Sequence, residues 1–490
     1  MTKKLTHIIS GIDYKLLCGS LEKTIESITF DSRKVQTGSL FVALVGTLTD
    51  GHAYLSQAAE GGASVLLIEK ETNITPFEEK GITVLLTPNT RQSLGSIAAE
   101  FYDHPSSKIK LIGITGTNGK TTIATLLYEL FMQAGYKSGL ISTVRNCIAD
   151  AETPATHTTP DILKINELLS EMCQEECLYC FAEVSSHALT QGRVEGLQFH
   201  GAIFSNITHD HLDYHKTFTE YLKAKKLLFD QLPSSAFALI NHDDKNGKII
   251  AQNTRAEKYT YGLKSLADFK TKLIEQDFNG MLLRTREKEY WSLLTGTFNA
   301  YNLTAVFAAA VLCGLPEDRI LTLISSLSPV KGRLETVNIQ GITAIVDYAH
   351  TPDALENILK TINTIKRKSQ RLILIVGAGG NRDKQKRPLM GKIAAAASDL
   401  LILTSDNPRD ESPEQIIDDI FAGVSADKQL NTLKITQREE AIKTAVLSAK
   451  KEDIILIAGK GHETYQEIKG KRKHFDDKEL VINYLKFKTI

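Results

Sequence analysis

Short apolar runs recur along the second and third parts of the chain, with longer mixed segments between them. Runs that are apolar on both faces are typical of buried parallel strands, and the segments between them predict helices. Such alternation favours an α/β fold with open parallel sheets, whose ligand sites lie at the carboxyl ends of the strands. The runs are KLIGIT (110–115), YCFAEV (179–184), GAIFSNIT (201–208), AFALIN (236–241), TAIVDYA (343–349), RLILIVG (371–377), DLLILT (399–404) and DIILIAG (453–459).

Three predicted helices begin with similar tripeptides, TPD at residues 159–161, TPD at 351–353 and SPE at 412–414. The hydroxyl side chain can cap a helix, proline suits the first helical position, and the acidic residue complements the positive end of the helix dipole. After the first tripeptide, apolar residues recur three or four positions apart, which predicts a helix with one buried face.

The length of 490 residues suggests several domains rather than one core. Residues 1–107 mix short predicted strands and helices, residues 108–331 form a first α/β zone, and residues 332–490 form a second. The polar stretch HPSSK at residues 104–108 predicts a linker between the first two zones. The strand pattern restarts near residues 329–333.

The charge is balanced, with 58 Lys plus Arg and 58 Asp plus Glu. This balance gives no electrostatic reason to expect a nucleic acid or an anionic membrane as partner. The first residues lack a signal-peptide core, and no run of about 18 apolar residues occurs. We therefore expect a cytoplasmic protein with no membrane insertion.

Six cysteines occur, three of them in CQEECLYC at residues 173–180. A zinc site is one interpretation, but no second pair with zinc spacing follows. The favoured interpretation places Cys173 and Cys177 near a helix end and Cys180 in the next buried strand. In a reducing cytosol these are expected as free thiols.

The segment GITGTNGKTT at residues 113–122 lies between a predicted strand and a predicted helix. Its glycines let backbone N–H groups turn toward phosphate oxygens, and the helix N-terminus adds positive potential. Lys120 can bridge the β- and γ-phosphates, and the Thr121 hydroxyl can bind Mg²⁺. The spacing departs from the common phosphate-loop form because residue 114 is Ile. A glycine-rich turn without a ligand is the alternative, and even a phosphate loop indicates only a bound nucleotide.

Glu183 ends one predicted strand, and HDHLDYH at residues 209–215 follows another. The carboxyl ends of parallel strands meet at one sheet edge, so both segments are expected near the phosphate loop. A carboxylate and an imidazole beside phosphates suit a divalent cation, although Mg²⁺ prefers oxygen ligands to His211. Two alternatives stay open: a zinc hydrolase site, or histidines that cap helices and pair with Asp210 and Asp213.

A set of motifs in this order resembles the Mur ligases, which build the peptidoglycan stem peptide. The resemblance covers essentially the whole chain. It implies a three-domain α/β fold with an N-terminal UDP-binding domain (1–107), a central ATPase domain with a phosphate loop and a parallel sheet (108–331), and a C-terminal Rossmann-like amino-acid-binding domain (332–490). The motifs are GITGTNGKTT, EVSSH, SNITHDHLDYH, YLKAKKLLF, GTFNAYN, KGRLE, DYAHTPDAL and IAGKGHE.

The motifs DSR at residues 31–33 and DNPR at residues 406–409 make the chain similar to the branch that extends a UDP-linked muramoyl dipeptide. The resemblance implies an ADP-forming acid–amino-acid ligase with ATP and Mg²⁺ as cofactors, acting as a monomer. In that reaction ATP phosphorylates the D-Glu γ-carboxylate of UDP-N-acetylmuramoyl-L-Ala-D-Glu, and the incoming amine attacks the acyl phosphate. Positive charge is needed between the two anions that approach each other.

Matching positions imply the site residues. The catalytic residues are Lys120, Lys225 and His211, and the metal-binding residues are Thr121, Glu183, His211 and Lys225, where Lys225 matches a carbamylated lysine of the family. Without the family, Lys225 would be interpreted as a solvated lysine, like Lys223 and Lys226. The implied ATP contacts are Gly116, Thr117, Asn118, Gly119, Lys120, Thr121, Thr122, Asn299, Asn302, Arg333, Asp347 and His350. The implied UDP-dipeptide contacts are Ser32, Thr158, Thr159, Ser185, Gln191 and Arg193, and the implied diaminopimelate contacts are Arg382, Asp406, Asn407, Pro408, Arg409, Gly459 and Glu463.

The identity of the added amino acid depends on one arginine. meso-Diaminopimelate and lysine differ by one distal carboxylate, which a planar guanidinium binds bidentately. Arg409 would bind that carboxylate and repel a lysine ammonium, so it predicts meso-diaminopimelate. Arg382 is expected to hold the other carboxylate. By resemblance, lysine-adding relatives tend to lack the arginine of DNPR, and Asn381 stands where the family more often has Asp.

The nearest alternative function is that of folylpolyglutamate synthetase, which shares the phosphate loop and the amide chemistry but needs neither DSR nor DNPR. A nucleotide-dependent switch protein would bind ATP without ligation. Because the ATP site and the amino-acid site fall in different zones, closure of the C-terminal domain is expected.

Overall fold

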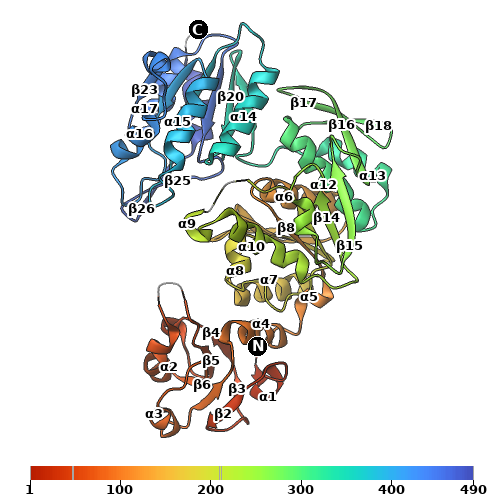
Figure 1. Cartoon of the computed structure of the whole chain (residues 1–490), viewed down its shortest axis with the longest axis vertical. Helices are drawn as coiled ribbons and strands as arrows, with labels where there is room; N and C mark the ends of the chain where they lie inside the picture. Colours follow the sequence, from red (N-terminus) through yellow and green to blue (C-terminus); the bar gives the residue numbers. More distant parts are fainter. Residues whose placement is uncertain (1, 47–48, 209, 211, 489–490) are drawn as a thin grey trace.

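The computed structural model describes residues 2–46, 49–208, 210 and 212–488. Figure 1 shows three domains in a row, from the red N-terminal domain through the orange and green central domain to the blue C-terminal domain. Each domain is built around its own main sheet. Within the described ranges, no helix is long and apolar enough to cross a membrane.

The N-terminal domain mixes short strands and helices, as predicted. Its elements are β1 (Lys3–Lys4), α1 (Leu5–Ile8), β2 (Lys15–Cys18), β3 (Thr24–Ile25), β4 (Ser27–Thr29), η1 (Ser32–Lys34), β5 (Ser39–Val42), η2 (Gly51–Tyr54), α2 (Leu55–Glu60), β6 (Ala63–Ile68), α3 (Thr75–Glu78), β7 (Thr83–Leu86) and α4 (Thr90–Phe101). The main sheet has the order β2-β7-β6-β5-β4, in which only β2 is antiparallel to its neighbour. A separate ribbon pairs β1 with β3.

The polar stretch at residues 104–108 lies between the N-terminal and central domains, where a linker was predicted, and it forms a short helix. It forms α5 (Pro105–Lys108), with proline at the start of the helix. Ser106 Oγ accepts a hydrogen bond from the backbone N of Gln198 (3.1 Å), and Cys173 Sγ donates to the carbonyl of Pro105 (3.6 Å). These contacts with the central domain give the polar residues a fixed structure that their composition does not indicate.

The central domain contains an eleven-stranded sheet. Its strands are β8 (Lys110–Thr115), β9 (Ser138–Ile141), β10 (Arg145–Ile148), β11 (Ala151–Pro154), β12 (Tyr179–Glu183), β13 (Gly201–Phe204), β14 (Phe237–Asn241), β15 (Glu257–Gly262), β16 (Phe269–Asp277), β17 (Gly280–Thr285) and β18 (Lys288–Ser292). The middle of the sheet, β9-β12-β8-β13-β14-β15-β16, is parallel, and antiparallel strands extend it at both ends. The four predicted strands β12, β8, β13 and β14 are confirmed and adjacent, so their carboxyl ends share one edge.

The helices of the central domain are α6 (Lys120–Gln133), α7 (Ile162–Gln174), α8 (Ser186–Thr190), α9 (Leu212–His215), α10 (Phe218–Asp230), α11 (Gly247–Ile250), α12 (Thr297–Leu312) and α13 (Glu317–Ser326). The predicted buried face of α7 is confirmed, but its cap is not the predicted threonine. The Asp161 carboxylate accepts from the backbone N of Leu163 and of Lys164 (both 3.1 Å). Thr159 is drawn away because its hydroxyl donates to the carbonyl of Glu183 (2.8 Å).

The cysteines of residues 173–180 lie as predicted. Cys173 is in the last turn of α7, Cys177 follows that helix, and Cys180 is buried in β12. All three are free thiols.

The C-terminal domain has a six-stranded sheet in the order β19-β20-β24-β21-β22-β23, parallel except for β19. Its elements are β19 (Glu335–Ile339), β20 (Ile342–Asp347), α14 (Pro352–Ile365), β21 (Leu372–Val376), α15 (Lys386–Ala397), β22 (Leu400–Leu403), α16 (Pro413–Phe421), η3 (Ala426–Asn431), β23 (Thr432–Lys434), α17 (Arg438–Ser448), β24 (Ile454–Ala458), β25 (Tyr465–Ile468), β26 (Lys471–His474) and α18 (Asp477–Phe487). The four predicted strands are β20, β21, β22 and β24. The predicted caps Thr351 and Ser412 are also confirmed, and proline follows each of them.

Candidate active site

The loop between β8 and α6 has the predicted strand–loop–helix arrangement. Gly116 (φ 150°) and Gly119 (φ 89°) have backbone conformations that side chains disfavour. A Cβ on Gly116 would overlap Ser205 Oγ, and a Cβ on Gly119 would lie 2.6 Å from Asn302 Oδ1. Glycine is therefore required at both positions, and the loop packs directly on the residues that follow β13 and on α12.

Lys120 is the first residue of α6 and folds back over the loop. Its Nζ donates to the carbonyl oxygens of Gly116 and Thr117 (both 2.9 Å). Burial lowers the pKa of Lys120, and the carboxylate of Glu183 opposes this shift. The ammonium thus lies at the N-terminus of a helix, where backbone N–H groups and the helix dipole favour an anion.

A buried carboxylate lies beside the loop. Glu183, at the end of β12, has no exposed surface. Its Oε2 accepts from Thr121 Oγ1 (3.0 Å), and its Oε1 accepts from the backbone N of Thr143 (2.7 Å). Arg333 of the C-terminal domain donates to the same Thr121 hydroxyl (3.2 Å). The carboxylate and the hydroxyl are oxygen donors of the kind that Mg²⁺ prefers, so the pair fits a magnesium ion.

Lys225 is the buried lysine of α10, with 1% of its surface exposed. Its Nζ donates to the carbonyl of Gly116 (2.7 Å). Burial lowers the pKa of Lys225 well below its usual value, and the nearby Lys120 ammonium adds to this effect. Lys223 on the same helix is exposed and pairs with Glu220 (2.9 Å). The fold therefore distinguishes lysines that are equivalent in the sequence pattern.

The start of the C-terminal domain brings further predicted nucleotide residues to the loop. The Asp347 carboxylate accepts from the backbone N of Leu334 (2.6 Å) and of Ala349 (2.8 Å), and burial raises its pKa. These bonds hold the turn that presents Arg333. The Arg333 guanidinium lies 4.7 Å from the ring centroid of Tyr348.

Two polar side chains lie near the start of α14, and one of them, Asp353, contacts the phosphate loop. His350 Nδ1 lies 2.8 Å from the carbonyl of Tyr348, and burial lowers the pKa of His350 to about 4, so the ring is neutral at pH 7. The Asp353 carboxylate accepts from Asn118 Nδ2 (2.7 Å) and from Thr208 Oγ1 (3.1 Å). Asp353 thereby joins the C-terminal domain to the loop.

The predicted asparagines of α12 lie together. Asn302 Nδ2 donates to Asn299 Oδ1 (3.0 Å), and Asn299 Nδ2 donates to the carbonyl of Thr295 (2.9 Å). Asn302 also packs against Gly119 of the loop. Asn299 lines a separate cavity of about 300 Å³, which Arg333 also lines.

Four residues predicted to bind the UDP-dipeptide meet beside the start of α8. Thr159 Oγ1 accepts from the backbone N of Ser185 (3.0 Å). Arg193 donates to the carbonyl of Thr159 (2.8 Å) and to Gln191 Oε1 (2.7 Å). The four side chains therefore form one polar cluster next to Glu183.

The residues predicted to bind the distal end of diaminopimelate meet beyond β22 and β24. Asn407 Nδ2 donates to Glu463 Oε2 (2.7 Å). The fully buried Lys460 donates to Asn407 Oδ1 (3.0 Å) and to Glu463 Oε2 (3.1 Å). Arg409 Nη1 donates to the carbonyl of Gly380 (2.7 Å). These hydrogen bonds hold the loops that follow β21, β22 and β24 together at this edge of the sheet.

A cavity of about 960 Å³ lies between the central and C-terminal domains. It brings the phosphate loop, Glu183 and most of the predicted diaminopimelate residues to one space. The predicted residues that line it are Thr117, Asn118, Gly119, Lys120, Thr121, Thr158, Glu183, Ser185, Arg333, His350, Arg382, Asp406, Asn407, Arg409, Gly459 and Glu463.

Other predicted residues lie elsewhere. Ser32 belongs to the N-terminal domain, where its hydroxyl donates to Gln57 Oε1 (2.9 Å). His211, predicted to be catalytic and metal-binding, lies outside the described residues. The remaining predicted residues belong to the loop or to the structure beside the cavity and do not line it; they are Gly116, Thr122, Thr159, Gln191, Arg193, Lys225, Asn302, Asp347 and Pro408.

Sequence reasoning missed several polar side chains of the cavity. Thr143 follows β9, and its place after a buried strand is a signal that could have indicated it. Asp353 was predicted only as an acidic residue that complements the helix dipole at a helix start, not as a residue of the cavity. Lys386, whose Nζ donates to the carbonyl of His350 (3.1 Å), has no distinguishing signal. Burial lowers the pKa of Lys386.

The fold and the cavity define a three-domain protein in which a nucleotide-binding loop faces a second polar binding surface. Family models match along the chain, described as the catalytic domain of the Mur ligase family at residues 24–102, the Mur ligase middle domain at 114–310 and the Mur ligase glutamate ligase domain at 332–461.

Several relatives match the chain over nearly its full length. The chain is 52% identical over 480 residues to the UDP-N-acetylmuramoyl-L-alanyl-D-glutamate--2,6-diaminopimelate ligase of Bacteroides fragilis, with 98% of each covered. It is 41% identical over 490 residues to the ligase 1 of the same name from Clostridium acetobutylicum, with 99% of each covered. A solved structure of a ligase with this name matches with a TM-score of 0.71 and 31% identity, covering 99% of each chain. The chain therefore belongs to the Mur ligase family.

Proposed function

We propose that the chain adds meso-2,6-diaminopimelate to the D-Glu γ-carboxylate of UDP-N-acetylmuramoyl-L-Ala-D-Glu in cytoplasmic peptidoglycan precursor synthesis. ATP is converted to ADP and phosphate in this ATP-dependent ligation. The observation that carries the proposal is the shared cavity, whose walls hold both the phosphate loop and Arg409. The names of relatives that match over the whole chain support the same substrates.

The first chemical step is attack of the D-Glu γ-carboxylate oxygen on the γ-phosphorus of ATP, with ADP as the leaving group. Two anions approach each other, so cations beside them lower the barrier. Lys120 at the loop supplies one positive charge, and Arg333 next to Thr121 supplies another. The amine of diaminopimelate then attacks the acyl carbon, loses a proton, and phosphate leaves.

Thr121, Glu183, His211 and Lys225 are the residues that would hold Mg²⁺. The pair of Thr121 and Glu183 supports this role because both offer oxygen atoms beside the loop. A neutral Lys225 amine that adds CO₂ would offer a carbamate oxygen there. When bound, Mg²⁺ neutralises charge on the phosphates and on the attacking carboxylate.

The binding roles divide between the domains. Thr158, Thr159, Ser185, Gln191 and Arg193 bind the dipeptide part of the substrate, and Ser32 binds its UDP part. Asn299 and Asn302, with His350 and Asp347, complete the ATP site. The domain boundaries belong to the same proposal, at residues 1–107, 108–331 and 332–490, as does a monomeric state.

Arg409 selects the amino acid in this proposal. Its side chain lines the cavity beside Asn407 and Glu463, where a second amino-acid end would lie. The guanidinium binds the distal carboxylate, the Glu463 carboxylate binds the distal ammonium, and Arg382 binds the other carboxylate. Lysine lacks the distal carboxylate and would leave Arg409 without its partner.

The test is phosphate release from ATP in the presence of UDP-N-acetylmuramoyl-L-Ala-D-Glu. We expect release with meso-diaminopimelate, little with L-lysine, and loss of this preference in Arg409→Ala. A preference for lysine would contradict the role of Arg409 and leave the ligase activity intact. Release only with a folate acceptor and glutamate would contradict the proposed function.

A further inference from the structure

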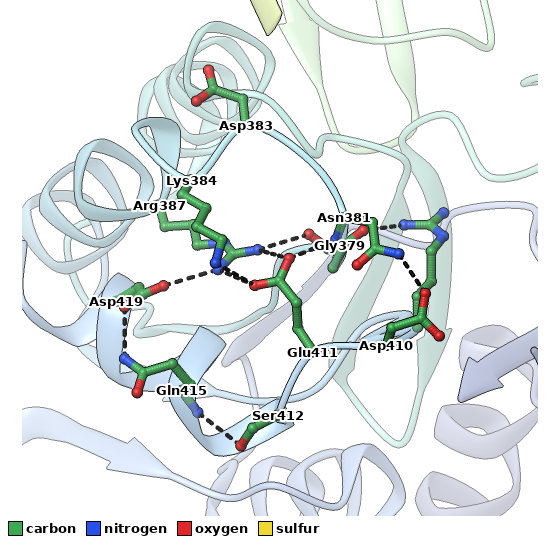
Figure 2. Close-up of polar contacts among 12 residues, drawn as sticks. Gly379, Asn381, Asp383, Lys384, Arg387, Asp410, Glu411, Ser412, Gln415 and Asp419 are labelled. Atoms are coloured by element: carbon green, nitrogen blue, oxygen red, sulfur yellow. Dashed lines mark hydrogen bonds and ion pairs between the residues drawn. The ribbon is translucent and has the colours of Figure 1, made fainter. Parts of the chain in front are cut away.

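Arg387 is a buried cation beside the cavity that the proposed mechanism does not use. It lies in the first turn of α15, and its side chain is 0% exposed. Its guanidinium makes two parallel bonds to Glu411, Nη1 to Oε2 and Nη2 to Oε1, each of 2.9 Å. It also donates to Asp419 Oδ2 on α16 (2.8 Å), as Figure 2 shows. Arg387 does not line the cavity, so its role is not direct contact with a substrate.

Glu411 joins the two loops that carry the predicted diaminopimelate arginines. It lies two residues after Arg409 in one loop. Its Oε1 accepts from the backbone N of Asn381 in the other loop (2.6 Å), immediately before Arg382. Asn381 Nδ2 also donates to Asp410 Oδ2 (2.7 Å), which is a further bond between the loops in Figure 2. The Glu411 carboxylate therefore connects both loops to Arg387, which also donates directly to the carbonyl of Gly379 in the Arg382 loop (3.4 Å).

Both loops have a backbone conformation that needs support. Asn381 (φ 54°) and Arg409 (φ 52°) lie in the left-handed region, which residues other than glycine rarely occupy. Such conformations persist only where surrounding contacts determine them. Here the bonds from Asn381 to Glu411 and Asp410 hold the first loop, and the bond from Arg409 to the carbonyl of Gly380 holds the second.

The supporting helices are in close contact, so Arg387 has little freedom to move. A Cβ on Gly391 of α15 would overlap the carbonyl oxygen of Ile420 on α16. A Cβ on Gly423, just after α16, would overlap the carbonyl oxygen of Pro388. The Arg387 guanidinium also keeps Glu411 ionised by lowering the pKa of that carboxyl to about 2. The pair is thus a rigid, charged brace between α15 and the two loops.

We propose that Arg387 and Glu411 are positioning residues that fix the spacing of Arg382 and Arg409, and thereby the selectivity for an amino acid with two carboxylates. This inference rests on the proposed function, in which these two arginines bind the two carboxylates of diaminopimelate. Binding of a ligand that is held at both ends depends on the distance between the two arginines, whereas lysine has only one carboxylate to bind. Asp419 contacts the same guanidinium but touches neither loop, so it provides a matched control.

The experiment compares the full-length variants Glu411→Gln, Arg387→Lys and Asp419→Asn with the wild type in the phosphate-release assay. Each carries a polar side chain of similar size, and thermal unfolding identifies any variant that is not folded. For Glu411→Gln and Arg387→Lys we expect the KM for diaminopimelate to rise about tenfold or more, because the arginines lose their spacing. The KM for ATP should change little, and the low rate with lysine should not fall in proportion. Asp419→Asn should lower the thermal stability without changing the preference for diaminopimelate over lysine.

A double variant distinguishes loss of the arginine positions from a general loss of activity. If the brace acts through Arg409, adding Glu411→Gln to Arg409→Ala should cause little further loss of preference. Equal rises in the KM for ATP and for diaminopimelate, or an unchanged KM for diaminopimelate in folded Glu411→Gln, would overturn the inference. If Arg387→Lys does not fold, Glu411→Gln decides the outcome. A wild type without preference for diaminopimelate would instead refute the proposed function on which the inference rests.

Discussion

At the scale of single residues, burial changes the chemistry of Lys225. Loss of water disfavours the ammonium form, and the neighbouring Lys120 ammonium acts in the same direction. An amine must be neutral to add CO₂, so the lowered pKa favours a carbamate on Lys225 near neutral pH. Lys226, the next residue, keeps an ion pair with Asp230 instead.

Carbamate formation at Lys225 can be tested with ¹³C-labelled bicarbonate. We expect one protein-bound carbamate signal by NMR in the wild type and in Lys223→Arg, and none in Lys225→Arg. Lys225→Arg should also lower kcat by about 10–100-fold because a metal ligand is lost, whereas Lys223→Arg should behave as the wild type. As the pH falls, the amine takes up a proton, so signal and activity should decrease together. A signal that persists in Lys225→Arg would contradict this role.

Single residues could be predicted from the sequence where a motif fixes their position relative to a strand end or a helix start. Glu183 is the last residue of β12, Lys120 and Thr121 begin the helix after the loop that follows β8, and the structure brings the three together. Lys225 came only from the family resemblance, because helical periodicity does not tell a buried lysine from an exposed one. Lys386 had no signal at all, since its place in the cavity depends on how α15 meets α14.

At the scale of elements, the loop between β8 and α6 depends on the backbone of Gly119 and on the space around it. Gly119 has a positive φ, and a Cβ there would also lie 2.6 Å from Asn302 Oδ1. Gly135, after the other end of α6, has a similar φ of 85°, but a Cβ there would meet nothing within 4 Å. A comparison of alanine substitutions at the two positions therefore distinguishes the effect of backbone strain from the effect of displacing the loop.

We expect Gly119→Ala and Gly135→Ala to lose a similar amount of stability, about 1 kcal/mol each, from the left-handed backbone. Only Gly119→Ala should raise the KM for ATP, by about tenfold or more, because the loop must move away from α12. Thermal unfolding and phosphate-release kinetics measure the two effects. An unchanged KM for ATP in Gly119→Ala would mean that the loop tolerates the displacement.

Elements could be predicted where the signal is local, and the exceptions have tertiary causes. The apolar runs located β8, β12 and β20 because strands buried on both faces need continuous apolar sequence. The helix starts at Thr351 and Ser412 were predicted correctly from their own side chains. The start at Asp161 was not, because Thr159 bonds to a distant strand end, and the helix α5 depends on contacts with the central domain.

At the scale of the whole molecule, the contacts of the C-terminal domain differ from place to place: Phe278 and Phe298 of the central domain pack against its apolar core, whereas its contacts with the phosphate loop are polar. Between the N-terminal and central domains, Ile162 of α7 packs in one apolar cluster with Leu94 and Ile97 of α4. Between the phosphate loop and the C-terminal domain, the contacts of Asp353 and Arg333 are polar. Polar contacts exchange readily with water, so we expect the C-terminal domain to be the part that opens and closes.

The contacts of Asp353 provide a test of this expectation. Asp353→Ala removes the acceptor of the bonds from Asn118 and Thr208, whereas Asp353→Asn keeps an acceptor oxygen and serves as the control. By small-angle X-ray scattering, the alanine variant without ligands should have a larger radius of gyration than the wild type. Its kcat/KM should fall about tenfold, equivalent to roughly 1.4 kcal/mol.

Ligands should reverse the effect of this variant. A non-hydrolysable ATP analogue with the UDP-dipeptide contacts both domains, so together they should bring the wild type and Asp353→Ala to the same compact dimensions. If the alanine variant scatters like the wild type without ligands and keeps normal kinetics, Asp353 does not set the position of the domain. In that case the Arg333 contact with Thr121 would be the next polar link between the C-terminal domain and the phosphate loop to remove, and Arg333→Ala would be the variant to measure.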